Sequence, residues 1–217
     1  AVSVLMALPL AFLVPADFLP RALPVFVLLG IGSTTMLYVA ALVLKEKADG
    51  TLNATLVSPQ SHVDYITAKI ISLAILALLE TFITIIILLA LTSREGITFE
   101  IMSFLDFSLG LVGLASLYVL IGLALVVRFK SLTDFLVPVL LLSAVIQAPF
   151  IHFLGLFEHW AFLLIPTAGP TLVMMQALGP VEPTVALFGY FWTALWVVLL
   201  ALWARRAFQR HIVEQAG

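Results

Sequence analysis

The sequence predicts an all-α integral membrane protein, because it is too apolar for a soluble domain and its apolar runs have the length of membrane-spanning helices. Hydrophobic residues make up 63% of the chain and charged residues 10%, whereas charged residues make up roughly 25% of a typical soluble domain. The mean hydropathy is +1.22. Apolar runs fill almost all of the 217 residues, so no separate soluble domain is expected.

Each predicted spanning helix is an apolar run that can cross a hydrocarbon core of about 30 Å, which takes about 20 helical residues. These runs are Ala22–Leu44, Ala68–Thr92, Ile101–Val127, Thr133–Leu154 and Thr184–Ala204. A further run, Ala1–Val14, reaches only about 21 Å at 1.5 Å per residue. We expect it to be a first helix truncated at its N-terminus, because a signal peptide, the alternative, has basic residues before its apolar core. The prediction is one transmembrane domain, residues 1–217, with six transmembrane helices.

The distribution of Lys and Arg predicts the orientation, because cytoplasmic loops retain these residues in excess. If segment 45–69 is cytoplasmic, only Arg21 and Arg94 lie outside. The cytoplasmic side then carries Lys45, Lys47, Lys69, Arg128, Lys130, Arg205, Arg206 and Arg210. Both termini are therefore expected in the cytoplasm, and the basic tail 205–217 suits an anionic cytoplasmic leaflet.

Charge, cysteine content and missing motifs exclude several function classes. The net charge of -2 argues against nucleic-acid binding, and the absence of cysteine excludes disulfides, thiol catalysis and cysteine-ligated metals. His152, Glu158 and His159 lie close in sequence, but spacing across a loop does not show converging ligands. We predict no metal site and expect these residues, with Trp160, at the membrane interface. The chain has no G-x-x-x-x-G-K-[ST] loop, so no catalytic residue and no bound cofactor are predicted.

The polar segment 45–69 interrupts the apolar pattern. Gly50 can supply a backbone turn, and Thr51 or Asn53 can cap a short helix. Leu52 and Leu56 fall on one face of that helix, which predicts an amphipathic helix on the membrane surface.

A second helix start follows in the same segment. Ser58 can act as the N-cap and Pro59 as the first helical residue. Asp64 suits the first turns of the rising helix, and Tyr65 and Lys69 lie one turn apart, where we expect them to anchor the helix at the level of the lipid headgroups.

The spacing in this segment resembles that of the membrane subunits of type-2 ABC exporters. The matching residues are Asp49-Gly50-Thr51-Leu52, Leu56, Ser58-Pro59, Ser61, Tyr65 and Lys69. Asp49 departs from the family, which usually has Glu there, but it keeps the charge. The run Leu164-Ile165-Pro166-Thr167-Ala168-Gly169-Pro170 and the tail His211-Ile212-Val213-Glu214-Gln215 are similar to those of fluoroquinolone-export permeases.

The resemblance implies that segment 45–69 is a cytoplasmic coupling segment, between the second and third transmembrane helices, with a coupling helix over about Lys45–Val57. This helix would lie in a groove of a separate ATPase subunit, which binds ATP and Mg²⁺. The residues implied in coupling are Lys45, Glu46, Asp49, Gly50, Thr51, Leu52, Leu56, Ser58 and Pro59. The alternative is a solvated connector that only links two helices.

Two carboxylates within apolar runs are candidates for the translocation path. Glu80 lies near the middle of Ala68–Thr92, where an ionised group is costly unless it is paired or hydrated. It could face a cavity and titrate during transport, or it could be neutral and hydrogen-bonded to Ser116 or Thr35 between helices. Asp106 lies closer to a membrane surface, where a position at the interface is favoured over one in the path.

The stretch Leu156–Gly179 predicts short re-entrant helices before the sixth transmembrane helix. Its apolar pieces, Trp160–Ile165 and Thr171–Leu178, are too short to span and are separated by Pro and Gly. Met174 and Met175 give it an adaptable apolar surface that could line the path, although packing is favoured. Pro138 and Pro149 predict a kink or break in Thr133–Leu154. Small residues in Ile101–Val127, Gly110 and Gly113 among them, allow close helix packing within one chain or between two.

These observations together predict the permease subunit of an ATP-driven ABC exporter in the plasma membrane, expected to be a bacterial inner membrane. Its expected partners are ATPase subunits, a second permease chain of the same or another kind, the lipid bilayer and a small hydrophobic, drug-like or lipid-like substrate. A proton-coupled secondary transporter that uses Glu80 is the first alternative. A membrane scaffold without transport is the second.

Overall fold

The computed structural model describes residues 2–50, 62–92 and 101–210, and every regular element in these ranges is helical. Five helices are long and apolar enough to cross a membrane. They are α2 (Leu19–Ala48), α4 (His62–Thr92), α5 (Ile101–Val126), α6 (Leu132–Gln147) continued by α7 (Pro149–Phe153), and α9 (Pro183–Phe208). The shorter elements are α1 (Val2–Phe12), α8 (Ala168–Gln176) and the 3₁₀ helices η1 (Ala16–Phe18) and η2 (Trp160–Leu164). The all-α membrane fold predicted from the sequence is therefore confirmed.

Local sequence signals explain where several helices begin and end. The Ser131 hydroxyl caps α6 by accepting a hydrogen bond of 3.2 Å from the Asp134 backbone N–H. The helix ends at Gln147, just before Pro149, so the predicted break in Thr133–Leu154 occurs at the second proline. Pro138 lies inside α6. The α2 helix ends at Ala48, and after the C-cap residue Asp49 the chain turns at Gly50, whose φ of 69° only glycine adopts readily.

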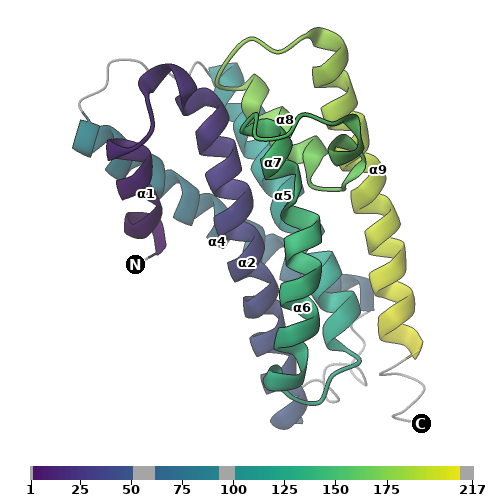
Figure 1. The fold of residues 1–217 in the computed structure, drawn as a ribbon. Coiled ribbons are helices and arrows are strands. Elements are labelled where there is room, and N and C mark those ends of the chain that lie inside the picture. The colour runs from purple at the N-terminus through teal and green to yellow at the C-terminus, as the bar shows by residue number, and fades with distance from the viewer. Residues whose placement is uncertain (1, 51–61, 93–100, 211–217) are drawn as a thin grey trace.

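Helix α5 lies at the centre of the bundle and contacts α2, α4, α8 and α9 (Figure 1). It is the most buried of the five long helices, whereas α9 is the most exposed. Small residues bring its neighbours close: a Cβ at Gly110 would lie 2.7 Å from the Met174 side chain, and one at Gly113 would lie 2.6 Å from Thr193. The small residues predicted to allow close packing thus pack within one chain.

The segment between α7 and α9 folds back on the bundle as η2 and α8 (Figure 1). Helix α8 is buried against α5 and α9, with only Gln176 of its residues partly exposed. The 3₁₀ helix η2 has no buried residue, and the Trp160 side chain is 66% exposed. Of the two predicted re-entrant pieces, only the second is inserted among the long helices.

Candidate functional site

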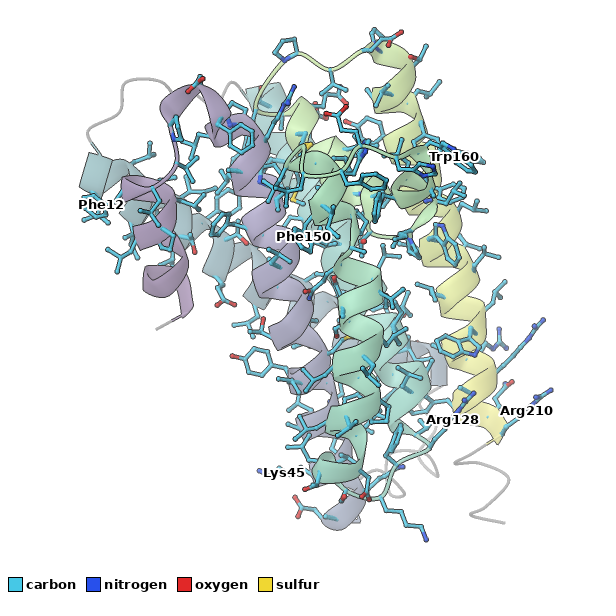
Figure 2. All side chains as sticks on the ribbon, in the orientation of Figure 1. Phe12, Lys45, Arg128, Phe150, Trp160 and Arg210 are labelled. Carbon is cyan, nitrogen blue, oxygen red and sulfur yellow. The ribbon has the colours of Figure 1, made fainter. Side chains whose placement is uncertain are left out.

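Most of the described basic residues lie at one end of the bundle, whereas Arg21, at the start of α2, lies toward the other. Figure 2 shows Lys45, Arg128 and Arg210 at that end and Phe12 and Trp160 toward the other. Lys45, Arg128 and Arg210 are exposed, as are Lys130, Arg205 and Arg206. The end of α2 and the start of α4 also lie at this end (Figure 1). The predicted coupling segment connects them.

Glu46, in the last turn of α2, makes two contacts with α4. Its Oε1 accepts a hydrogen bond of 2.5 Å from the Lys69 ammonium, and its Oε2 accepts one of 2.6 Å from the Tyr65 hydroxyl. The Lys69 side chain is only 15% exposed and that of Glu46 29%. Lys69 also lies over the Tyr65 ring, 5.2 Å from its centroid. We call Glu46, Tyr65 and Lys69 the Glu46 cluster.

The Glu46 cluster extends to the last long helix through an aromatic contact. The rings of Tyr65 and Phe208 are 5.4 Å apart between centroids, and Phe208, in α9, is fully buried. Further along, α4 and α9 separate and leave an open groove of about 280 Å³. The contact between Tyr65 and Phe208 joins the two helices at the basic end of this groove.

Lys47, the residue after Glu46, points to the other side of α2. Its ammonium donates hydrogen bonds to the carbonyl oxygens of Val127, at 2.9 Å, and Phe129, at 3.3 Å. These carbonyls follow directly after α5, where the negative end of the helix dipole favours a cation. Neighbouring residues of α2 thus bind α4 on one side and the turn between α5 and α6 on the other.

Of the residues implied in coupling, the structure describes those up to Gly50, at the end of α2. Lys45, Asp49 and Gly50 are exposed at the end of α2, and Glu46 is partly buried in its cluster. Thr51, Leu52, Leu56, Ser58 and Pro59 lie outside the described residues, as does the predicted amphipathic helix that contains them. The rising helix is described from His62, and Asp64 stands in its first turn as predicted.

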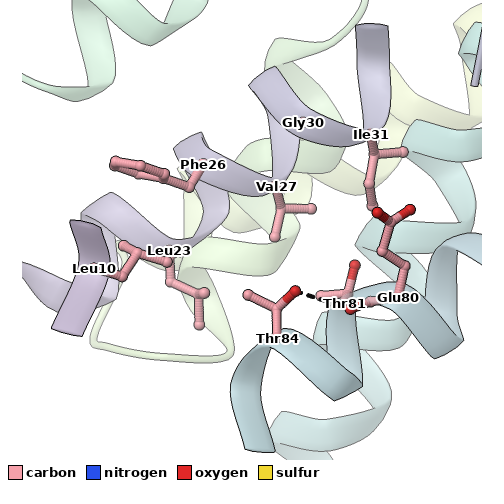
Figure 3. Close-up of a pocket in the computed structure, with 9 residues that line it drawn as sticks. All are labelled: Leu10, Leu23, Phe26, Val27, Gly30, Ile31, Glu80, Thr81 and Thr84. Atoms are coloured by element: carbon pink, nitrogen blue, oxygen red, sulfur yellow. Dashed lines mark hydrogen bonds between the residues drawn. The ribbon is translucent and has the colours of Figure 1, made fainter. Parts of the chain in front are cut away.

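Glu80 lies on α4 beside a small cavity bounded by α1, α2 and α4 (Figure 3). The cavity has a volume of about 10 Å³, which is close to the room that one water molecule needs. Its carboxylate is directed toward α2 (Figure 3) and makes no hydrogen bond within the described part of the chain. Ser116, one of the two predicted partners of Glu80, instead donates its hydroxyl to the Val112 carbonyl oxygen at 2.7 Å. The Thr84 hydroxyl donates to the backbone carbonyl of Glu80 at 2.9 Å and not to its carboxylate. The cavity is lined by Leu10, Leu23, Phe26, Val27, Gly30, Ile31, Glu80, Thr81 and Thr84.

Asp106 is held by the last helix rather than standing free. The Tyr190 hydroxyl of α9 donates a hydrogen bond of 2.7 Å to its Oδ1. Tyr190 also lines an open groove of about 280 Å³ between α5, α8 and α9, whose floor includes Gly113 and Val173. Asp106 itself is partly exposed and not among the residues that line this groove.

Residues 1–216 match the model of the fluoroquinolones export permease protein family. The chain belongs to this family. Two relatives, the fluoroquinolones export permease proteins of the Mycobacterium tuberculosis strains CDC 1551 / Oshkosh and ATCC 25618 / H37Rv, are each 28% identical to it over 207 residues. Each alignment covers 94% of this chain and 83% of the relative. No solved structure matches the chain.

Family membership confirms the resemblance inferred from the sequence and makes this protein a multi-pass membrane permease of an export family. Within this export permease, Met174 is fully buried against Gly110 of α5, and Met175 is also buried. Both methionines therefore pack inside the subunit in this conformation.

The permease also brings Tyr65 and Lys69 together with Glu46, a contact that was not predicted from the sequence. The polar atoms of Tyr65 and Lys69, which the sequence predicts at the level of the headgroups, bind Glu46. Their spacing of one helical turn was a usable signal, because it places both on the same face of α4. The missing information was which part of α2 that face meets.

Proposed function

We propose that this chain is the transmembrane subunit of an ATP-driven ABC exporter that moves hydrophobic, drug-like or lipid-like molecules out of the cell. In the proposal, two such chains, alike or different, form the path, and each has six transmembrane helices, of which the first contains α1. The observation that carries it is the family match over residues 1–216, joined to a coupling-type segment between α2 and α4. The relatives are named for the export of fluoroquinolones.

The mechanism assigns ATP and Mg²⁺ to a separate subunit, because the chain has no phosphate-binding loop of its own. The predicted coupling helix started at Lys45, but residues 45–48 form the last turn of α2. In the proposal, the part of the coupling segment that follows α2 lies in a groove of that ATPase, and closure of the ATPase moves α2 and α4. The gathering of exposed cations at the same end supports a cytoplasmic position for this segment and for both termini. The protein then lies in the plasma membrane, which for its bacterial relatives is the inner membrane.

The test is purification of the full chain, expressed with its native gene neighbours, in a mild detergent. We expect an ATPase subunit to co-purify and Leu52→Asp to release it, because a carboxylate in an apolar contact is desolvated without a partner. Leu132→Asp is the matched control, since Leu132 is an exposed leucine of α6 next to the basic turn at 128–130. Absence of an ATPase from the wild-type preparation would contradict the proposal, and so would its retention by Leu52→Asp.

A proton-coupled transporter is the second candidate, and one observation favours it. The Glu80 carboxylate lies beside a water-sized cavity near the middle of α4, without a hydrogen bond in the described part of the chain. An intramembrane carboxylate of this kind is a default functional candidate. This transporter would purify without an ATPase and would respond to a proton gradient alone, so the same preparation separates the two functions.

A further inference from the structure

We propose that Glu46 and Lys47 are positioning residues that make the helices on both sides of α2 follow the coupling segment as one body. The inference rests on the proposed function, because it assumes that an ATPase moves this segment. It assigns the transmission step to the Glu46 cluster and to the contacts of Lys47, and it leaves ATPase binding to residues 49–59.

The first step of the argument is the location of the cluster relative to the coupling segment. The segment, residues 45–69, begins in the last turn of α2 and ends in α4, which is described from His62. Glu46 lies near its start, and Tyr65 and Lys69 lie near its end. The two ends of the segment are therefore joined by side chains as well as by the backbone, so a displacement of the segment acts on α2 and α4 together.

The second step is the strength of this contact. Both carboxylate oxygens of Glu46 are used, one by Lys69 and one by Tyr65. Charge-assisted hydrogen bonds of this kind are stronger than neutral ones. The low exposure of Lys69 and Glu46 reduces screening by salt, which weakens ion pairs on open surfaces. The cluster can therefore keep α2 and α4 in contact while the ATPase moves the coupling segment.

The third step is how far the contact reaches. Tyr65 continues to α9 through its contact with the buried ring of Phe208. Lys47 binds the carbonyls of Val127 and Phe129, so the turn between α5 and α6 is attached to the same end of α2. Two adjacent residues thereby connect α2 to every other long helix of the described chain, either directly or through one neighbour.

The experiment uses the complete permease with its ATPase and exploits the absence of native cysteine. Thr184, exposed in the first turn of α9 at the far end, is replaced in a Thr184→Cys background as a reporter. The rate of maleimide labelling is measured with and without ATP. We expect ATP to change this rate in the reporter background and Lys69→Met to abolish the change while the ATPase stays bound.

Charge-reversal, hydroxyl and control variants separate transmission from loss of folding. Glu46→Lys and Lys69→Glu should each abolish the response singly, and together they should restore it, because the pair is re-formed with reversed charges. Tyr65→Phe removes one hydroxyl and should reduce the response with the fold kept. Lys130→Met is the matched control, since Lys130 is an exposed lysine at the same end without a side-chain contact among the described residues.

The outcomes distinguish this inference from the function beneath it. A wild-type chain that retains no ATPase overturns the proposed function, and the inference with it. A retained ATPase with no ATP-dependent labelling, or with equal labelling changes in Lys69→Met and the reporter background, overturns the inference alone. Release of the ATPase by Lys69→Met also overturns it, because the cluster would then shape the docking surface.

Discussion

The Thr167 hydroxyl donates a hydrogen bond of 2.5 Å to the carbonyl of Ile146, and both groups are buried. Ile146 lies in the last turn of α6, next to the break at Pro149, whose ring removes a backbone donor from this turn. The last carbonyls of a helix need partners from outside it. Thr167, just before α8, supplies one and so joins the inserted segment to the end of α6.

Replacing Thr167 with valine should therefore destabilise the permease with almost no change of shape. The substitution leaves the Ile146 carbonyl without this donor in an apolar interior, which costs about 1–3 kcal/mol. Thermal unfolding of the purified protein in detergent measures the loss, and Thr167→Ser is the control that keeps the hydroxyl. Equal unfolding temperatures for Thr167→Val and the wild type would show that the carbonyl finds another partner.

The contact between α8 and α9 depends on a glycine. A Cβ at Gly169 would lie 2.9 Å from the Thr193 backbone nitrogen and 3.0 Å from the Gly189 carbonyl oxygen. These are backbone atoms, so neither can rotate away, and overpacking of this kind typically costs 1–3 kcal/mol. We expect Gly169→Val to lower the unfolding temperature clearly.

Gly179 offers a matched control for that substitution. A Cβ there would meet only Pro20, at 3.7 Å, which is an ordinary contact distance. Gly179→Ala should accordingly be tolerated, whereas Gly169→Ala should already destabilise the protein. If both alanine variants unfold at the same temperature, α8 is less closely held against α9 than described.

Glu80 gives a prediction about transport. If its carboxylate titrates during the cycle, Glu80→Gln should change the transport rate or remove its dependence on pH, because the amide cannot ionise. The measurement is uptake of a fluoroquinolone into inside-out vesicles across a range of pH values. Thr84→Val serves as a control that alters the same cavity without removing the carboxylate. Rates that are unchanged at every pH would leave Glu80 a role in helix packing only.

The sequence predicted the long helices well, because each is an uninterrupted apolar run. The start of α5 at Ile101 agrees, α6 begins one residue before the predicted Thr133, and α9 begins one residue before the predicted Thr184. The cap at Ser131 and the break at Pro149 were also predictable, since both depend on residues within one turn.

The partners of Glu46 and Lys47 were not predictable in the same way. Lys47 reaches a carbonyl 80 residues away, and Glu46 reaches Lys69 across the coupling segment. Such contacts depend on how α2, α4 and α5 rotate about their axes, and nearly uniform apolar helices give little information on rotation. The difference in burial between α8 and η2 was not predicted for a related reason, because both segments are apolar.

Gly50 allows the sharpest test of the coupling segment. Its φ of 69° lies outside the range open to proline, whose ring fixes φ near −65°. Gly50→Pro should redirect the chain as it leaves α2 and abolish retention of the ATPase, while the membrane helices stay folded. Gly50→Asn is the matched control, because asparagine tolerates the left-handed conformation better than other residues. Among the described residues, no atom lies within 4 Å of a Cβ at Gly50. Retention of the ATPase by Gly50→Pro, with an unfolding temperature like that of the wild type, would mean that the direction of this turn does not matter for coupling.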